Sequence, residues 1–497
     1  MESPLGAVPL DDDRVRFRVC APAAERVAVR VGVEELELEP AGDGIHEGVL
    51  AVSPGVDYRY VLDGGGAWPD PCSRWQPDGV SGPSRVLDTG SFAWSAEPPD
   101  LELERLVVYE LHVGTFSAEG TFDGAIKHLP ALRDLGVTAI ELMPVATFPG
   151  DRGWGYDGLY TSAPHEAYGG PHGLTRLVEA AHAAGLGVLL DVVYNHVGPG
   201  NEALTAFGPY FSDRHDTVWG QALDYTQRGV REWAIQNAAL WARDYRVDGL
   251  RLDAVATIAD DESPRHVLTE LRERVPELLL IDEMEIGNLR PLEEWGHDAQ
   301  WNDAFHHAAH VLLTGEHDGY YEGYGKVADL ARELERSRPQ LVVCAQNHDQ
   351  VGNRAIGDRL TPEQDRVALS AVLFSRSTPL LFQGEEYGET RPFQFFTDHT
   401  DPAIAEATRE GRRKEFATFE SFSGEELPDP QAESTFRASK LAHGEPLPWV
   451  RELLALRPTL ADTLETEVDE DARTLVGRRG EATLRLDFAN TTVELDA

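Results

Sequence analysis

Several short apolar segments of the sequence end in side chains that can carry charge or transfer protons. In chain order these side chains are Asp191, Asn195, His196, Arg251, Asp253, Glu283, Asn347, His348 and Asp349. A single aspartate after a strand commonly caps the next helix, and a single short motif is a weak signal. Four segments with such ends in chain order instead indicate one site that combines carboxylate, imidazole and guanidinium groups.

Two of these carboxyl groups suit the hydrolysis of a glycosidic bond. In a retaining glycosidase one carboxylate attacks the sugar, and a second carboxyl group about 5–5.5 Å away donates a proton. Arg251 and Asp253 are two apart on a predicted strand and share a face, so the guanidinium favours an ionised, nucleophilic carboxylate. Glu283 ends an apolar segment, and its partial burial predicts the raised pKa of a proton donor. Asp349 supplies a third carboxylate that raises the pKa of Glu283 further.

Apolar segments and amphipathic helices alternate between about residues 106 and 390, which is typical of parallel strands buried on both faces. The predicted strands are 106–111, 137–142, 187–193, 247–255, 278–283, 299–303, 341–346 and 379–382. The predicted helices are 122–135, 172–184, 229–244, 264–274, 325–337 and 362–375. Eight strands of this kind predict an α/β fold, a (β/α)8 TIM barrel, whose site lies at the carboxyl ends of the strands. An open doubly wound sheet is the alternative, but a Gly-rich loop does not follow the first strand.

The segments on either side of the barrel predict two β domains. Residues 14–62 alternate apolar and polar residues between turns, which is typical of a β-sandwich, and 63–100 are a Gly- and Pro-rich linker. After residue 445 come a helix at 449–456 and strands at 483–488 and 491–495. We therefore expect an N-terminal β-sandwich at 1–95, a catalytic barrel at 96–445 and a small C-terminal β domain at 446–497.

The composition restricts the classes of partner. The 497 residues include 44 basic and 86 acidic ones, a net charge of −42. Such a surface repels nucleic acids and anionic membranes. We find no apolar stretch of about 18 residues that would span a membrane and no secretory signal in the first 13 residues. Three widely spaced cysteines show neither disulfide density nor zinc spacing, so we expect a cytoplasmic protein.

The charged strand ends resemble, in the same order, the four signature regions of the α-amylase superfamily of retaining glycosidases. The resemblance covers essentially the whole chain and includes a carbohydrate-binding-like N-terminal domain. It implies that Asp253 is the nucleophile, Glu283 the acid/base and Asp349 the stabiliser of the transition state. It further implies that Arg251, His196 and His348 bind the sugar at the cleaved bond. The remaining candidates for substrate binding are Asp191, Asn195, Tyr156, Asp157, Trp219 and Asp398.

Within the superfamily the chain resembles the maltooligosyltrehalose trehalohydrolases. The segments that carry this resemblance are 109–116, 153–158, 313–316, 319–321, 346–354, 395–398, 429–431 and 439–441. The resemblance implies hydrolysis of the α-1,4 bond next to the trehalose end of maltooligosyltrehalose, with release of trehalose. It implies a maltooligosyltrehalose synthase as pathway partner. We interpret Asp398 as a residue that selects trehalose over maltose.

Two residues depart from the family pattern. Ala256 stands where the family often has histidine, and Glu285 is a second acid beside Glu283. Glu283 directly ends the apolar strand and is the preferred acid. No organic cofactor is expected, and the acidic residues lack the spacing of a calcium loop, so no metal is expected. A branching or debranching enzyme and a non-catalytic glucan-binding relative remain as alternatives.

Overall fold

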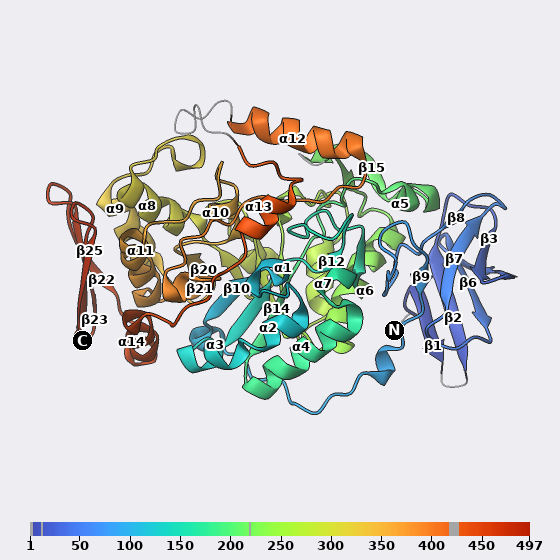
Figure 1. Ribbon diagram of the computed structural model, residues 1–497, viewed down its shortest axis with the longest axis horizontal. Helices are drawn as coiled ribbons and strands as arrows, with labels where there is room; N and C mark the ends of the chain where they lie inside the picture. Colours follow the sequence, from blue (N-terminus) through green and yellow to red (C-terminus); the bar gives the residue numbers. More distant parts are fainter. Residues whose placement is uncertain (1–2, 11–12, 218–219, 417–426) are drawn as a thin grey trace.

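A closed parallel barrel forms the centre of the molecule (Figure 1). The computed structural model describes residues 3–10, 13–217, 220–416 and 427–497. The barrel strands are β10 (Val108–Leu111), β11 (Ala139–Leu142), β14 (Gly187–Val192), β17 (Gly249–Leu252), β18 (Leu279–Asp282), β19 (Ala299–Trp301), β20 (Leu341–Cys344) and β21 (Thr378–Phe382). Because β10 pairs with both β11 and β21, the sheet closes on itself. The predicted TIM barrel is confirmed, and the open-sheet alternative is wrong.

Helices surround the barrel strands, and most of the predicted ones are found. They include α4 (Gly170–Ala184), α6 (Arg228–Arg243), α7 (Val267–Arg274), α9 (Val327–Arg336) and α11 (Pro362–Phe374). The single helix predicted at 122–135 is two helices, α2 (Phe122–Ile126) and α3 (Leu129–Leu135). Pro130 lies in the first turn of α3, where its missing N–H costs nothing. None of the described helices is long and apolar enough to cross a membrane.

Helix α8 (Asp303–Thr314) is one of the helices that the sequence did not predict. It follows β19 and buries most of its residues, including three histidines. Histidine is intermediate between apolar and polar residues in its tendency to be buried. Three histidines at buried positions therefore interrupt the apolar pattern by which this helix could be recognised in the sequence. One of these histidines, His307, lines a cavity of the molecule.

The N-terminal region is a sandwich of two antiparallel sheets, as predicted. One sheet has the order β1 (Gly6–Leu10), β2 (Arg14–Cys20), β6 (Ile45–Leu50), β5 (Glu39–Gly42). The other has the order β4 (Glu34–Glu37), β3 (Val27–Val31), β7 (Asp57–Leu62), β8 (Ala67–Trp68), and β9 (Ser84–Arg85) also pairs with β7. The expected linker thus contributes two short strands to this sandwich. Its last part crosses to the barrel, where Ser95 binds Glu179 of α4.

A glycine allows the sandwich to approach the barrel closely. A Cβ atom added at Gly229, in the first turn of α6, would lie 2.1 Å from Sγ of Cys20 on β2. An ion pair between Arg228 and Asp43 spans 3.1 Å beside this contact. The N–H of Leu5 also donates to Gln236 of α6 over 2.7 Å. These contacts fix the sandwich against one side of the barrel (Figure 1).

The C-terminal sheet is larger than the sequence indicated. Strands β24 (Ala482–Asp487) and β25 (Thr492–Asp496) correspond to the two predicted strands, and β22 (Glu465–Asp469) and β23 (Thr474–Arg479) precede them. The extra strands were missed because charged residues occupy most of β22. Helix α14 (Pro448–Leu456) links this sheet to the barrel and packs on α11.

Two arginines of the C-terminal region bind the end of α11. Arg457 donates to the carbonyls of Leu373 and Ser375, over 2.7 Å in each case. Arg479, on β23, donates to the carbonyl of Phe374 over 3.0 Å. The last carbonyls of a helix lack partners within the helix, and cations there also interact favourably with the helix dipole. The C-terminal region therefore caps the helix that precedes the last barrel strand.

Replacing Gly229 with alanine is expected to lower the free energy of unfolding by about 1–3 kcal/mol, the usual range for overpacking. The added methyl group meets Cys20 in a packed interface. Chemical denaturation measures the effect. Gly411→Ala on α12 (Pro402–Phe416) is the matched control, because its added Cβ meets open space and helix propensity favours alanine. Equal stability of both variants, or failure of a second change Cys20→Ala to recover stability in the Gly229 variant, would contradict the steric explanation.

Candidate active site

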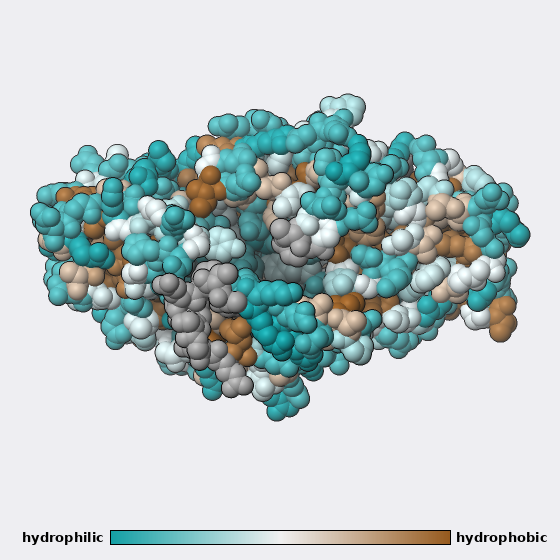
Figure 2. All heavy atoms as spheres, turned by 90° about the horizontal axis from the view of Figure 1, so that it is seen from above, coloured by the Kyte–Doolittle hydropathy of each residue, from teal (hydrophilic) through white to brown (hydrophobic). Residues whose placement is uncertain are grey.

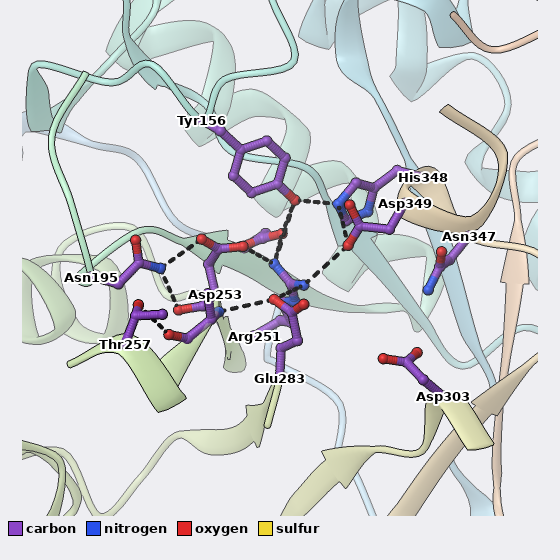
Figure 3. A network of polar contacts seen from close by, with 12 residues as sticks. Tyr156, Asn195, Arg251, Asp253, Thr257, Glu283, Asp303, Asn347, His348 and Asp349 are labelled. Atoms are coloured by element: carbon purple, nitrogen blue, oxygen red, sulfur yellow. Dashed lines mark hydrogen bonds and ion pairs between the residues drawn. The ribbon is translucent and has the colours of Figure 1, made fainter. Parts of the chain in front are cut away.

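Arg251 occupies the centre of the site at the carboxyl end of β17 (Figure 3). Its side chain is completely buried. The guanidinium donates to Asp191 over 2.7 Å, to Asp253 over 2.8 Å and to Glu283 over 2.7 Å. Its carbon atom lies 4.2 Å from the ring centre of Trp301. One buried cation thus draws carboxylates from three neighbouring strands together, and the expected proximity of Arg251 and Asp253 is confirmed.

Asp253 is held on both of its carboxylate oxygens. Arg251 binds Oδ1, and the amide of Asn195 donates to Oδ2 over 2.7 Å. The next residue, Ala254, has a left-handed backbone with φ of +41°, a conformation that costs free energy for residues other than glycine. This turn directs the N–H of Ala254 at Glu283, which accepts it over 2.9 Å. The strained turn therefore joins the two carboxyl groups.

Glu283 has the electrostatic environment of a proton donor. Its side chain is 26% exposed. Loss of hydration raises its pKa to about 8, against the opposing effect of Arg251 and with support from the negative charges of Asp253, Asp349 and Asp303. The expected elevation by burial and by Asp349 is thus found, and Asp303 is an additional contributor. At neutral pH this carboxyl group is mostly protonated.

A chain of hydrogen bonds orders the opposite side of the site. His348 Nδ1 lies 2.5 Å from one carboxylate oxygen of Glu110, and the other oxygen accepts the N–H of His348 over 2.9 Å. Burial lowers the pKa of His348, but Asp349 and Glu110 outweigh it and raise the pKa to about 10. The cationic ring donates from Nε2 to Tyr156 over 2.7 Å, and Tyr156 donates to Asp191 over 2.6 Å. The chain returns to Arg251 through Asp191.

Two buried acids next to the site were not identified from the sequence. Glu110 on β10 and Glu141 on β11 are each only 1% exposed. Burial, followed by the charges of Glu110 and Asp191, raises the pKa of Glu141 well above its usual range. The feature of the sequence that could have identified them is a glutamate within a short apolar strand, Val-Tyr-Glu-Leu in β10 and Ala-Ile-Glu-Leu in β11. Each stands at the same register position of its strand, since Glu110 pairs with Glu141.

The remaining residues predicted from the sequence differ in whether they contact this network. His196 is 6% exposed, contacts the side chain of Asn195 and lies 3.0 Å from the Tyr156 carbonyl. Asp157 lies 3.6 Å from His399, and burial raises its pKa. Asp398 forms an ion pair of 2.6 Å with Arg152. Trp219 falls outside the described residues.

A cavity of about 610 Å³ opens next to these groups. Its lining residues include Glu283, Asp303, Asp349, Ala256 and Glu285. Helix α12 contributes Glu415 to it, and Figure 2 shows a hollow among largely hydrophilic residues in the face that carries this helix. Glu285, the competing acid, is exposed on the cavity wall, whereas Glu283 binds Arg251. The geometry therefore favours Glu283 as the acid.

The arrangement is equipped for acid-assisted displacement at a sugar carbon. It offers an ionised carboxylate, a protonated carboxyl group beside the same guanidinium, and donors for sugar hydroxyls in a cleft. Within the described part of the chain, no group of three or more His, Cys, Asp or Glu side chains has the geometry to hold a metal ion. The closed barrel and this carboxyl pair define the class of the protein, an α-amylase-type glycoside hydrolase.

Comparisons with known proteins agree with this class and refine it. Residues 83–209 match the catalytic domain of the α-amylase family. The chain is 45% identical to malto-oligosyltrehalose trehalohydrolase of Deinococcus radiodurans, over 91% of this chain and 82% of that protein. It is 41% identical to the enzyme of the same name from Saccharolobus solfataricus, over 87% and 82%. A candidate alpha amylase from Salmonella typhimurium has a crystal structure with a TM-score of 0.87, 39% identity and coverage of 98% and 93%. The chain belongs to the malto-oligosyltrehalose trehalohydrolase family.

Glu110→Gln is expected to lower the pKa of His348, because one of the two carboxylates that stabilise the imidazolium is lost. Histidine-labelled protein followed by NMR through a pH titration measures this pKa directly. The free energy of unfolding should fall by roughly 1–3 kcal/mol, the cost of disrupting a buried charged hydrogen bond. Glu433→Gln, in an exposed ion pair with Arg437, is the matched control. An unchanged His348 pKa in the Glu110 variant would show that Glu110 does not hold the charge.

Proposed function

We propose that this protein hydrolyses the α-1,4-glucosidic bond next to the trehalose end of maltooligosyltrehalose and releases trehalose with a shortened maltooligosaccharide. The observation that carries the proposal is the pair Asp253 and Glu283 on one buried arginine, at the mouth of a barrel whose sequence relatives bear the trehalohydrolase name. A neutral oligosaccharide also suits a surface with a net charge of −42, which disfavours anionic substrates.

In the proposed mechanism Glu283 protonates the leaving oxygen while Asp253 attacks the anomeric carbon. The glycosyl-enzyme is then hydrolysed by a water that Glu283 deprotonates, with net retention of configuration. The Arg251 and Asn195 contacts support ionised Asp253, and the raised pKa of Glu283 supports its role as acid. Asp349 lines the cavity with Glu283, which supports its assignment as stabiliser of the transition state.

Further residues are proposed to bind the sugar on the glycone side of the bond. Their polar contacts with Arg251, Asp253 or one another support this assignment for most of them. They are Arg251, His196, His348, Asp191, Asn195, Tyr156 and Asp157. Asp398 and Trp219 are proposed as substrate contacts from the sequence alone, Trp219 because an aromatic side chain in a loop can stack on a sugar ring.

The proposal also covers the domain boundaries, the pathway partner and the location of the protein in the cell. We place the domain boundaries at 1–95, 96–445 and 446–497, and the positions of the N-terminal sandwich, the barrel and the C-terminal sheet support this division. The substrate chemistry calls for a maltooligosyltrehalose synthase upstream, in the cytoplasm. A different α-glucan activity, branching or debranching, is the alternative within the superfamily.

Purified protein is expected to release trehalose from maltotetraosyltrehalose at least tenfold faster than it cleaves maltohexaose. Product chromatography of the two reactions side by side measures this preference. Asp253→Ala should abolish turnover of both, since the nucleophile is lost. Comparable cleavage of both substrates, or branched products, would assign the protein to another α-glucan activity. If neither substrate is cleaved, the result would favour the alternative of a non-catalytic glucan-binding protein.

The pH profile of kcat/KM is expected to fall on the alkaline side near pH 8. Glu283 must carry its proton to act as acid, its pKa is raised to about 8, and kcat/KM reports the free enzyme. Asp303→Asn removes a charge that raises this pKa, so the alkaline limb should move to lower pH. Asp134→Asn, exposed on α3, is the matched control. An alkaline limb that stays in place in the Asp303 variant would contradict the electrostatic assignment.

A further inference from the structure

The cavity beside Glu283 extends to a rigid polar wall that the mechanism does not use. This wall consists of Glu316, Arg354 and Tyr321, and His310 contacts Glu316 from outside the lining. Glu316 and Arg354 line the same cavity as Glu283 and Asp349. The wall comes from the segment after α8 and from the segment after α10 (His348–Gly352), so it is built by two neighbouring barrel loops.

Several contacts fix the wall in one geometry. Arg354 binds both oxygens of Glu316, over 2.7 and 2.8 Å, and Asp358 over 2.8 Å. His310 Nε2 lies 2.7 Å from Oε2 of Glu316, and the ring of Tyr321 stacks on His310 at 4.4 Å. Burial raises the pKa of Glu316, but Arg354 and His310 outweigh it and lower the pKa below its usual range. The wall therefore presents a fixed carboxylate and a fixed guanidinium.

The position of Glu283 assigns this cavity to the leaving group. An acid that protonates the leaving oxygen must stand on the leaving-group side of the bond. Glu283 lines the cavity, whereas Asp253 and Tyr156, on the glycone side, are not among its described lining residues. A disaccharide that departs from Glu283 consequently extends toward Glu316 and Arg354.

The wall has the chemistry to distinguish two disaccharides. Trehalose and maltose both continue from C1 of the first glucose, but trehalose joins its second ring through C1 and maltose through C4. Different hydroxyls of the second ring therefore face a fixed wall. A carboxylate has about four lone-pair positions, and Glu316 uses three in the contacts above. A guanidinium and a carboxylate side by side can bind adjacent hydroxyls.

We propose that the Glu316–Arg354 pair binds the second glucose of the trehalose leaving group and selects substrates that end in trehalose. This inference rests on the proposed function and adds a specificity determinant to it. Glu316 is 26% exposed and Arg354 13% exposed, so both reach the cavity from a packed wall. Asp398 is paired with Arg152 and is not among the described lining residues, so its contribution is separate.

The experiment compares two substrates for each variant. Glu316→Gln and Arg354→Lys are expected to lower kcat/KM for maltotetraosyltrehalose by roughly 10- to 100-fold, the range for hydrogen bonds to charged groups. The kcat/KM for maltohexaose should change less than threefold, which also shows that the variants fold. Glu433→Gln is the matched control and should leave both values unchanged.

The outcomes separate this inference from the proposed function. If the wild-type protein shows no preference for maltotetraosyltrehalose, the proposed function fails. If the wild type has the preference but both variants keep it, or lose both activities in parallel, the Glu316–Arg354 assignment is wrong. Crystals of Glu283→Gln soaked with trehalose give an independent check. A second glucose within hydrogen-bonding distance of Glu316 or Arg354 supports the inference, and a trehalose bound elsewhere overturns it.

Discussion

The site depends on the burial of one positive charge. A guanidinium with no exposed surface, such as Arg251, is stable only if carboxylates and hydrogen bonds compensate for its lost hydration. Asp191, Asp253 and Glu283 provide that compensation from three consecutive strands of the barrel. The same requirement brings the two carboxyl groups of the proposed mechanism beside each other. Structural stability and the positioning of reactive groups therefore have a common cause here.

Much of this arrangement could be predicted because it is local in sequence. A run of apolar residues that ends in Asp191, Arg251 or Glu283 identifies both a buried strand and the position of its carboxyl end. In a closed parallel barrel all such ends meet at one mouth. The order of charged residues along the chain was thus sufficient to predict their proximity. The two-residue spacing of Arg251 and Asp253 predicted a direct contact for the same reason.

The parts that could not be predicted depend on pairing across long distances or on exceptions to residue preferences. Glu110 meets His348, 238 residues away, and a glutamate in an apolar strand does not by itself name its partner. The buried histidines of α8 and the charged strand β22 contradict the usual patterns for their elements. Asp398 is a charged residue beside aromatic ones in the sequence, yet its carboxylate is already bound by Arg152.

The cap that Arg457 and Arg479 place on α11 has a consequence for the order in which the chain folds. Domains generally begin to fold as they leave the ribosome, from the N-terminus onward. The sandwich can form early, but the barrel cannot close until β21 is available to pair with β10. The helix just before β21 keeps uncapped carbonyls until Arg457 and Arg479 have been synthesised. In a nascent chain the barrel therefore stays open until β21 has emerged, and the end of α11 stays uncapped until the two arginines follow.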